Sequence, residues 1–287
     1  MIKYTSVSDL LNTIRLNLWK IPNNIDLIVG VPRSGMFCAI LVSEFLNKPV
    51  ISIEDFLLGL EPSFGGRIKK TSNFKNILVL EDTAYTGRSI LDAKQKCLNL
   101  GNANNYNFIF GCIYAEGKEA TKKVDIYFEN NYDPNTTLCH LYEWNILQHD
   151  EYVSKYLMFD MDGILCKEPP DERNTEEYID YIQHATSMVI PSSMIGAIVT
   201  YRLNIYREIT EKWLKDTGIQ YKALYMVKAN SWEERARMCS PAQYKAYVYK
   251  NATWALLFIE SDKRQAQEIA KLSNKPVWCY EDGKMYQ

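Results

Sequence analysis

Short apolar runs alternate along the chain with longer stretches in which apolar residues recur at helical spacing. This alternation predicts an α/β architecture in which mostly parallel strands are joined by helices. The apolar runs of the first half predict strands at 27–29, 77–80, 108–114 and 124–128. Helices are expected through 37–45 and 90–98, and Gly101 is well placed to end the second of them.

A second series of strands and helices begins at residue 156. Its apolar runs predict strands at 156–159, 198–199, 224–226, 256–259 and 277–279, with helices through 205–213 and 265–272. A polar segment around 149–155 separates the two series. We therefore expect two domains, residues 1–150 and residues 151–287, each long enough for its own core.

Composition and charge exclude several classes of protein. The 33 basic and 35 acidic residues give a net charge of -2, which offers no general attraction to nucleic acid. No apolar stretch approaches the roughly 18 residues that suggest a membrane span, and the start of the chain lacks the layout of a secretion signal. The seven cysteines form no C-x-x-C pair, so we expect buried or half-buried thiols rather than a zinc site. These features favour a cytoplasmic protein with no nucleic-acid partner.

The most informative segment of the first half follows the apolar run 77–80. That run leads directly into Glu81 and Asp82, then into a turn of small and polar residues, then into a helix. A strand that feeds a helix through such a turn presents backbone N–H groups and a positive dipole end to an anion. Gly87 lets the backbone approach a phosphate closely. Hydroxyl donors stand at Thr83, Thr86 and Ser89.

This segment resembles the ribose-phosphate motif of type I phosphoribosyltransferases, in which two acids precede a T-x-x-T-G-like loop. The resemblance implies that Glu81 and Asp82 hold the 2- and 3-hydroxyls of ribose. It implies that the 5-phosphate lies in a loop formed by Thr83, Ala84, Tyr85, Thr86, Gly87 and Ser89. The resemblance covers roughly residues 20–130 and implies phosphoribosyl diphosphate as donor, Mg2+ as cofactor and a homodimer.

Two further loops fit the same family. Gly30–Gly35 again joins a strand to a helix, and it resembles the pyrophosphate loop, with Arg33, Ser34 and Gly35 as binding residues. The segment 61–70 suits a mobile lid over a diphosphate through Arg67 and Lys69, although a solvated surface loop explains each cation equally well. The aromatic segment 140–145 is either part of an acceptor-binding hood or an aromatic plug between the domains.

The second half opens on a strand that ends in D-x-D-G. Asp160 and Asp162 are two residues apart, so in an extended chain both carboxylates lie on the same side. Together they can share a divalent cation, with one acid attacking phosphorus and the other handling protons. This strand and motif strongly resemble motif I of the haloacid dehalogenase (HAD) superfamily.

The remaining motifs of that superfamily follow in order. The resemblance implies that Thr200 binds the transferring phosphoryl group and that Lys245 neutralises negative charge at the nucleophile, with Lys250 as the alternative. It implies that Mg2+ is held by Asp160, Asp162, Glu260 and Asp262. A serine separates the last two acids, so either could be the main ligand. Short intervals between the motifs leave room for only a minimal cap, and the resemblance covers residues 156–287.

Together the resemblances imply two Rossmann-like domains, a type I phosphoribosyltransferase fold followed by a HAD-like fold. The implied enzyme is bifunctional: it transfers 5-phosphoribosyl from phosphoribosyl diphosphate to an acceptor and then removes the 5-phosphate to leave a ribosyl group. A saccharide or glycan is the favoured acceptor, because the fused arrangement looks like bacterial proteins of surface-glycan assembly. One alternative is a nucleobase acceptor with a nucleotide phosphatase. Another is a module that senses the diphosphate, fused to an independent phosphatase.

Overall fold

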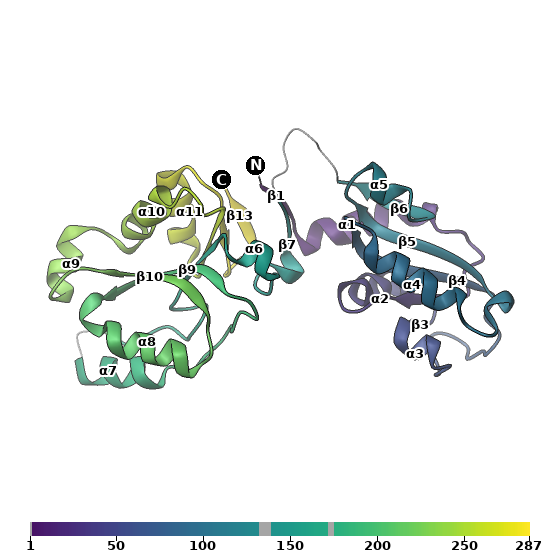
Figure 1. Ribbon diagram of the computed structural model, residues 1–287, viewed down its shortest axis with the longest axis horizontal. Helices are drawn as coiled ribbons and strands as arrows, with labels where there is room; N and C mark the ends of the chain where they lie inside the picture. Colours follow the sequence, from purple (N-terminus) through teal and green to yellow (C-terminus); the bar gives the residue numbers. More distant parts are fainter. Residues whose placement is uncertain (1, 132–138, 172–174) are drawn as a thin grey trace. The chain divides into compact units, whose positions relative to one another are not determined.

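The computed structural model describes residues 2–131, 139–171 and 175–287 (Figure 1). Contacts between residues divide the chain into two compact units, Thr5–Cys139 and His140–Gln287. Residue 3 of the first strand packs with the first unit, and residues 2 and 4 pack with the second. Residues 140–150, which the sequence analysis assigned to the first domain, belong to the second unit.

The first unit is built on a fully parallel five-stranded sheet of order β3-β2-β4-β5-β6. Its strands are β2 (Leu27–Gly30), β3 (Val50–Ser52), β4 (Asn76–Ala84), β5 (Asn107–Ala115) and β6 (Ile126–Asn130). Its helices are α1 (Val7–Asn17), α2 (Ser34–Leu46), α3 (Ile53–Leu57), α4 (Arg88–Leu98) and α5 (Lys118–Thr121), with 3-10 turns at Leu18–Lys20 and Ala103–Asn105.

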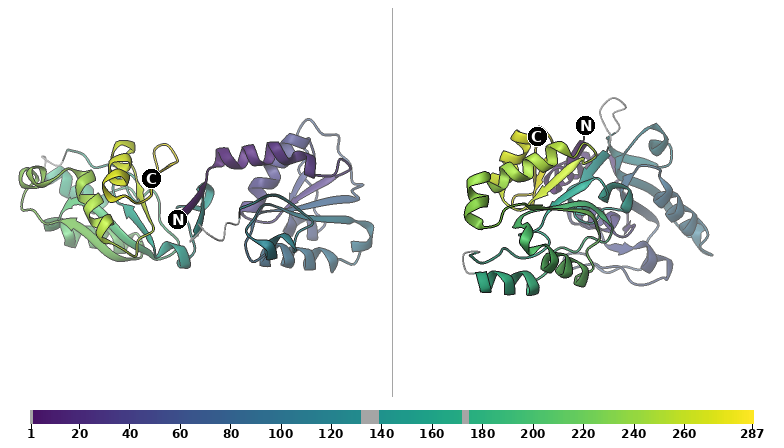
Figure 2. Two further views of the ribbon diagram at one scale, coloured as in Figure 1. Left: turned by 90° about the horizontal axis from the view of Figure 1, so that it is seen from above. Right: turned by 60° about the vertical axis from the view of Figure 1, so that its left-hand side comes forward.

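Helices cover both faces of this sheet (Figure 2). Alternate residues of β2 and β4, such as Leu27 and Ile77, form one buried cluster with Ile90 of α4. The helices α1 and α2 pack on the other side, where α2 contacts β2 and β4. Because both faces are buried, the strands read as continuous apolar runs in the sequence.

The second unit contains a six-stranded sheet of order β10-β9-β8-β11-β12-β13, parallel except for its last strand. Its strands are β8 (Leu157–Asp160), β9 (Ile195–Leu203), β10 (Tyr221–Val227), β11 (Leu257–Glu260), β12 (Val277–Cys279) and β13 (Lys284–Tyr286). Its helices are α6 (Glu151–Ser154), α7 (Thr175–His184), α8 (Arg207–Asp216), α9 (Trp232–Met238), α10 (Pro241–Asn251) and α11 (Lys263–Ser273), with 3-10 turns at Glu143–Asn145 and Asn204–Tyr206.

A separate two-stranded sheet pairs β1 (Ile2–Thr5) with β7 (Cys139–Tyr142). The phenol of Tyr4 donates to the carbonyl oxygen of Gly283 at 2.7 Å and accepts from the indole N–H of Trp278 at 3.0 Å. These two bonds attach the amino-terminal strand to the last strands of the second unit.

Each parallel sheet has a point where the strand order reverses. In the first unit the chain passes from β2 to β3 on one side and then to β4 on the other. In the second unit β8 is followed by β9 on one side and by β11 on the other. In open α/β sheets, ligands bind at the carboxyl ends of the strands at such a reversal. The topology therefore predicts one ligand site after β2 and β4 and another after β8.

The structure confirms an α/β fold with mostly parallel sheets, but two strands are longer than the apolar runs predict. β4 continues to Ala84 because β5 stays beside it, pairing with Glu81 and Thr83, so both acids lie within a strand. β9 continues to Leu203, which places Thr200 inside a strand rather than at its end. Backbone pairing with a neighbouring strand thus extends each strand across polar residues.

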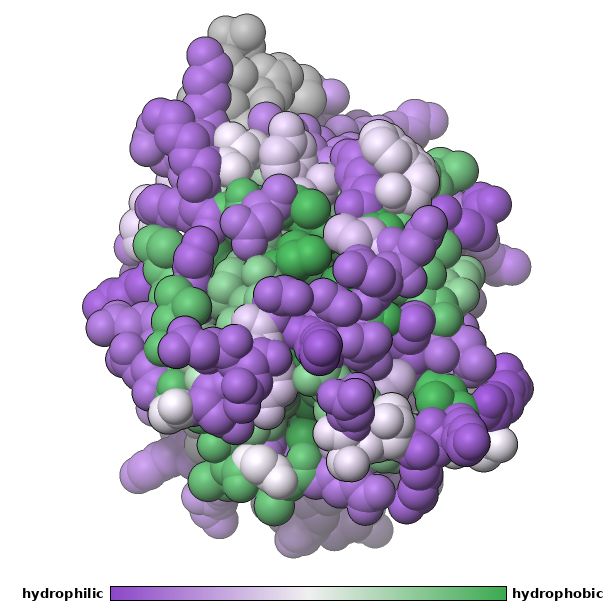
Figure 3. Space-filling view, turned by 90° about the vertical axis from the view of Figure 1, so that its right-hand side faces the viewer, coloured by the Kyte–Doolittle hydropathy of each residue, from purple (hydrophilic) through white to green (hydrophobic). Residues whose placement is uncertain are grey.

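The surface shown in Figure 3 intersperses hydrophobic side chains with hydrophilic ones. No helix in the described ranges combines the length and the apolar character that a bilayer crossing requires. All seven cysteines are free thiols, either buried or half-buried, as the sequence analysis expects. The homodimer stays a prediction.

Candidate active sites

Two adjacent carboxylates lie buried near the end of β4. Glu81 and Asp82 each expose only 6% of their surface. The hydroxyl of Ser89 donates to Glu81 Oε2 at 2.5 Å, and the backbone N–H of Asp82 donates to Glu81 Oε1 at 3.1 Å. Burial raises the pKa of Glu81 to about 8; the bond from Ser89 opposes this rise, and the charge of Asp82 adds to it. Glu81 is therefore a carboxyl group with a strongly raised pKa, of the kind that clusters at functional sites.

The loop after β2 lies directly against these acids. The backbone N–H of Val31 donates to the carbonyl oxygen of Leu80 at 2.9 Å. A Cβ on Gly35 would stand 2.7 Å from that same oxygen and 2.9 Å from Glu81 Oε1. Only glycine allows the first turn of α2 to approach the acidic strand this closely. The structure thus brings together the two phosphate-type loops that the sequence analysis singled out.

The two helices that follow these loops begin without side-chain caps. The N-cap residues, Arg33 before α2 and Gly87 before α4, satisfy no N–H group of the first turn, and at α4 the Thr86 hydroxyl oxygen accepts from the Arg88 N–H at a long 3.4 Å. By contrast, Ser6 and Ser52 cap α1 and α3 in the same unit. Uncapped N–H groups and the positive helix end make each of these starts suitable for an anion.

Lys123, a residue that no motif indicated, covers the second loop. Its ammonium group donates to the carbonyl oxygen of Thr86 at 2.5 Å, and its aliphatic chain lies against Gly87. Gly87 has a positive φ of 67°, which favours glycine. Lys123 comes from the connection between α5 and β6, so only the fold brings its charge to this loop.

The binding residues expected around these loops differ in exposure. Arg33, Tyr85, Thr86 and Ser89 are exposed. Thr83 and Ser34 are half-buried, and Ala84 is buried in β4. The exposed hydroxyls and Arg33 can therefore meet a ligand, whereas Ala84 contributes backbone and packing.

The expected lid residues lie at the other edge of the sheet. Ser63 exchanges two backbone bonds with Val50, the first residue of β3, at 2.9 and 3.1 Å. Arg67 lines a hollow of about 370 Å³ together with Asn47 at the end of α2. Because the strands are parallel, the start of β3 and the end of α2 both lie at the edge of the sheet where its strands begin. The structure therefore does not bring Arg67 and Lys69, which is on the same segment, to the loops after β2 and β4.

The expected hood segment packs within the second unit. The rings of His140 and Tyr142 stack with centroids 4.3 Å apart, and Tyr142 lies 4.8 Å from Trp144. A Cβ on Gly283 would stand 2.8 Å from Glu143 Oε1, so this segment also contacts the turn before β13. In the structure it forms an aromatic cluster of the second unit.

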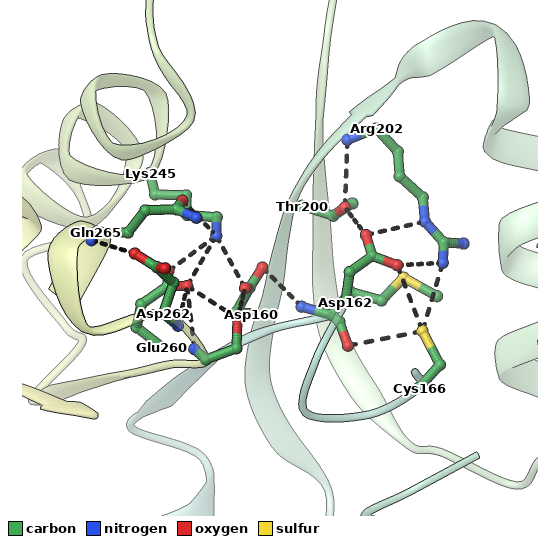
Figure 4. A network of polar contacts seen from close by, with 11 residues as sticks. Asp160, Asp162, Cys166, Thr200, Arg202, Lys245, Glu260, Asp262 and Gln265 are labelled. Carbon is green, nitrogen blue, oxygen red and sulfur yellow. Dashed lines mark hydrogen bonds and ion pairs between the residues drawn. The ribbon is translucent and has the colours of Figure 1, made fainter. Parts of the chain in front are cut away.

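In the second unit, Lys245 stands between two buried acids (Figure 4). Its ammonium nitrogen lies 2.8 Å from Asp160 Oδ2 and 2.8 Å from Glu260 Oε2, and it also donates to Gln265 Oε1 at 3.0 Å. Burial raises the pKa of Asp160 well above its usual range, with Glu260 adding to the rise and Lys245 opposing it. Burial alone would lower the pKa of Lys245, but the charges of Asp160 and Glu260 raise it, so the lysine stays protonated.

Asp162 turns away from this cluster toward Arg202 (Figure 4). The guanidinium donates through Nε to Asp162 Oδ2 at 3.2 Å and through Nη2 to Oδ1. Thr200 donates to the same carboxylate at 3.3 Å and Tyr181 at 3.0 Å. Burial would raise the pKa of Asp162, but Arg202 holds it below its usual value. Asp162 is therefore ionised and fixed in direction.

The sequence analysis missed Arg202, although the sequence carries a signal for it. Arg202 is two residues after Thr200 in β9, so the period of a strand places both side chains on the same face. Its side chain is only 1% exposed, and a buried arginine is expected to pair with an acid. Because Thr200 was already predicted to lie near Asp162, the strand period could have suggested that Arg202 pairs with Asp162 as well.

A pocket of about 480 Å³ opens over both clusters. Beyond Asp160, Asp162 and Lys245, its walls include Glu168, Tyr178, Tyr201 and Arg235. The guanidinium of Arg235 lies 4.1 Å from the ring centroid of Tyr201, and its Nη1 donates to the carbonyl oxygen of Tyr201 at 2.6 Å. A larger groove of about 750 Å³ beside β10 contains none of the motif residues.

The four expected metal ligands do not converge. Asp162 forms an ion pair with Arg202, and Glu260 forms one with Lys245. Asp262 caps α11, because its Oδ1 accepts from the backbone N–H of Gln265 at 2.7 Å. Within the described residues, no group of three or more Asp, Glu, His or Cys side chains is arranged to hold a metal ion.

No protein-family model matches the chain, and no curated protein matches it. Solved structures are similar to it over about half of its length. Xanthine-guanine-hypoxanthine phosphoribosyltransferase of Helicobacter pylori aligns at 15% identity and a TM-score of 0.39, over 51% of this chain and 95% of that chain. Purine phosphoribosyltransferase of Pyrococcus horikoshii aligns at 19% identity and a TM-score of 0.36, over 50% and 93%. Orotate phosphoribosyltransferase of Aeropyrum pernix aligns at 20% identity and a TM-score of 0.29, over 40% and 61%.

Proposed function

We propose that this chain is a bifunctional enzyme. Its first unit transfers 5-phosphoribosyl from phosphoribosyl diphosphate to an acceptor, and its second unit removes the 5-phosphate to leave a ribosyl group. The observation that supports transfer most strongly is the position of Glu81 and Asp82. This buried pair lies beside two loops whose helices start without side-chain caps, at the point where strand order reverses.

Each part of the donor has a chemically suitable partner in the first unit. Carboxyl oxygens accept hydrogen bonds from the ribose hydroxyls, and a carboxyl group keeps this capacity when it is protonated, so the role suits both Glu81 and Asp82. The start of α4, with Lys123 beside it, suits the 5-phosphate. The start of α2, with exposed Arg33, suits the diphosphate. Bound with the donor, Mg2+ would stabilise the charge that develops on the departing pyrophosphate.

The second unit has the groups for phosphate-ester cleavage through a covalent intermediate. An oxygen of the ionised Asp160 carboxylate attacks phosphorus, the bond from phosphorus to the ribosyl oxygen breaks, and the departing oxygen takes a proton from solvent water. Water then hydrolyses the aspartyl phosphate to regenerate the carboxylate. Lys245 offsets the negative charge around Asp160. Because Arg202 keeps Asp162 ionised, Asp162 is suited to accept a proton from that water.

Coupling the two reactions explains why they would share a chain. Removing the 5-phosphate leaves a plain ribosyl group, so the acceptor product can no longer re-form the donor. A saccharide is our favoured acceptor. A nucleobase acceptor with nucleotide dephosphorylation is the alternative, and a donor-sensing module beside an independent phosphatase is the third possibility.

One experiment separates these possibilities. Purified protein is incubated with phosphoribosyl diphosphate, Mg2+ and pooled saccharide or nucleobase acceptors, and pyrophosphate, phosphate and product mass are measured. Acceptor-dependent pyrophosphate release with a product mass of acceptor plus ribosyl supports the coupled enzyme. Donor binding without acceptor-dependent pyrophosphate, whichever acceptor pool is supplied, would leave only the sensing alternative.

A further inference from the structure

Arg202 has a hydrogen-bonding group that the fold does not use. Its Nε and Nη2 bind the two oxygens of Asp162, and Nη2 also donates to the phenol oxygen of Tyr181 at 3.3 Å. Among the residues that the structure describes, Nη1 has no hydrogen-bond partner, although this nitrogen is buried and the side chain is only 1% exposed. A buried N–H group without a partner destabilises a fold, so Nη1 indicates that a bound group completes its hydrogen bonds.

The planar shape of the guanidinium group determines where Nη1 points. Because Nε and Nη2 both face Asp162, Nη1 lies on the opposite side of the group, as Figure 4 shows. Asp162 itself is turned away from Asp160, so Nη1 is not directed at the oxygen that would attack phosphorus. Arg202 nevertheless lines the pocket of about 480 Å³ that Asp160 also lines. A group bound to Nη1 is therefore a part of the ligand other than the reacting phosphoryl group.

The chemistry of the pocket wall indicates the kind of group that Nη1 meets. A guanidinium nitrogen can only donate, and its strongest partners are the oxygens of a carboxylate or a phosphate. A second buried arginine, Arg235, lines the same pocket, with its guanidinium over the ring of Tyr201, the residue before Arg202. Two acids, Glu168 and Asp171, line the pocket as well. An oxyanion would therefore be held by direct contact with a guanidinium group rather than by an excess of positive charge.

We propose that the second unit acts on phosphate esters that carry a second oxyanion, a carboxylate or a further phosphate, and that Arg202 binds this oxyanion through Nη1. This assignment rests on the proposed phosphatase function of the second unit. The ion pair with Asp162 holds the guanidinium group in the orientation that the contact requires. In the proposed sequence of transfer and dephosphorylation, the second oxyanion belongs to the acceptor, so the favoured saccharide acceptor would be an acidic one.

Three matched esters test this assignment by binding. Uridine 5′-monophosphate is the parent, orotidine 5′-monophosphate adds a carboxylate to its base, and uridine 3′,5′-bisphosphate adds a phosphate to its ribose. Isothermal titration measures their dissociation constants with the full chain carrying Asp160→Asn, which removes the proposed nucleophile and so keeps the esters intact. At least one ester with the added oxyanion is expected to bind about tenfold or more tightly than the parent, and the ester that does so identifies the oxyanion as carboxylate or phosphate.

A variant of Arg202 then shows whether this residue causes the preference. Arg202→Lys removes Nη1 but keeps a positive charge for Asp162, and it is expected to reduce the preference for the added oxyanion to less than about twofold. A purely structural role of Arg202, or ester binding in the first unit, would leave this ratio unchanged. Lys215→Gln removes an exposed cation of α8 that does not line the pocket, so the preference should persist in this control.

Two outcomes overturn the assignment. One is that the added oxyanions leave the affinity for the chain unchanged, a result that needs no variant of Arg202 and so stands even if Arg202→Lys fails to fold. The other is a preference that persists in folded Arg202→Lys. Hydrolysis of the three esters by the wild-type chain is measured separately. A preference that depends on Arg202, without hydrolysis of any ester, would refute the phosphatase function while the oxyanion site stands. Hydrolysis without any preference would refute the oxyanion site alone.

Discussion

The raised pKa of Glu81 makes the stability of the first unit depend on pH. In the folded chain burial holds this pKa at about 8, whereas its usual value is 4.5. Between these two pH values the folded state retains a proton that the unfolded chain has lost, so raising the pH through this window destabilises the fold. The Glu81→Gln variant cannot lose that proton and still offers Ser89 an acceptor.

We therefore expect wild-type protein to lose stability relative to Glu81→Gln between pH 5 and pH 8, by an amount on the order of 2–4 kcal/mol. Urea unfolding of both proteins at several pH values measures the difference. Parallel stability curves for the two proteins would show that Glu81 is ionised in the fold at neutral pH.

The ion pair between Asp162 and Arg202 allows a prediction about the free energy of unfolding. Arg202 is 1% exposed and Asp162 16%, so each charge depends on the other in place of water. Removing one partner of a buried pair typically costs about 3–5 kcal/mol, because the remaining charge is left uncompensated. We expect Arg202→Met to cost this much, as measured by chemical denaturation.

The double variant Arg202→Met with Asp162→Leu is the control for this prediction. It removes both charges, so it should be more stable than Arg202→Met alone. A double variant no more stable than the single one would mean that the guanidinium stabilises the fold through packing rather than through its pairing with Asp162.

At the scale of elements, the closeness of α2 to β4 sets the geometry of the first site. A Cβ at Gly35 would meet a backbone oxygen of Leu80 and a side-chain oxygen of Glu81, both under 3.0 Å. We expect Gly35→Ala to destabilise the protein by about 1–3 kcal/mol and to weaken binding of phosphoribosyl diphosphate, because it must displace the strand or the carboxylate.

Gly66→Ala is a matched control, since no atom lies within 4 Å of the added Cβ there. Isothermal titration with the donor and thermal unfolding compare the two variants. Equal donor affinity in Gly35→Ala and wild type would show that the approach of α2 to Glu81 does not shape the site.

The same elements show how far sequence reasoning reaches. Apolar runs located β2, β4 and β8, since strands buried on both faces are continuously apolar. The carboxyl groups of Glu81 and Asp160 could be assigned to the carboxyl ends of strands, because each residue directly follows such a run. The position of Lys123 beside the loop after β4 depends on long-range packing, which local pattern does not encode. The sequence could not show where the segment around Arg67 lies. Its position is set by the backbone pairing of Ser63 with the first residue of β3, which holds the segment at the amino-terminal edge of the sheet.

At the scale of the whole molecule, each unit has its own sheet, its own reversal of strand order and its own acidic strand. A chain of this kind could run two reactions with separate machinery. The groups proposed for transfer all lie in Thr5–Cys139, and those proposed for dephosphorylation all lie in His140–Gln287. Substitutions in one unit should therefore leave the chemistry of the other unchanged.

Two variants test this separation. Asp160→Asn replaces the proposed nucleophile with an amide of the same shape, so phosphate release should fall by at least about a thousandfold. Acceptor-dependent pyrophosphate release should stay within about twofold of the wild-type rate. The phosphorylated ribosyl product should then accumulate and be visible by mass. Glu81→Gln with Asp82→Asn should abolish transfer and leave ester hydrolysis intact.

Mixing the two variants should restore the dephosphorylated product if the intermediate leaves one site and diffuses to the other. Loss of both activities from either variant would contradict independent sites, and failure of the mixture to complement would mean that the intermediate is passed on within a single chain.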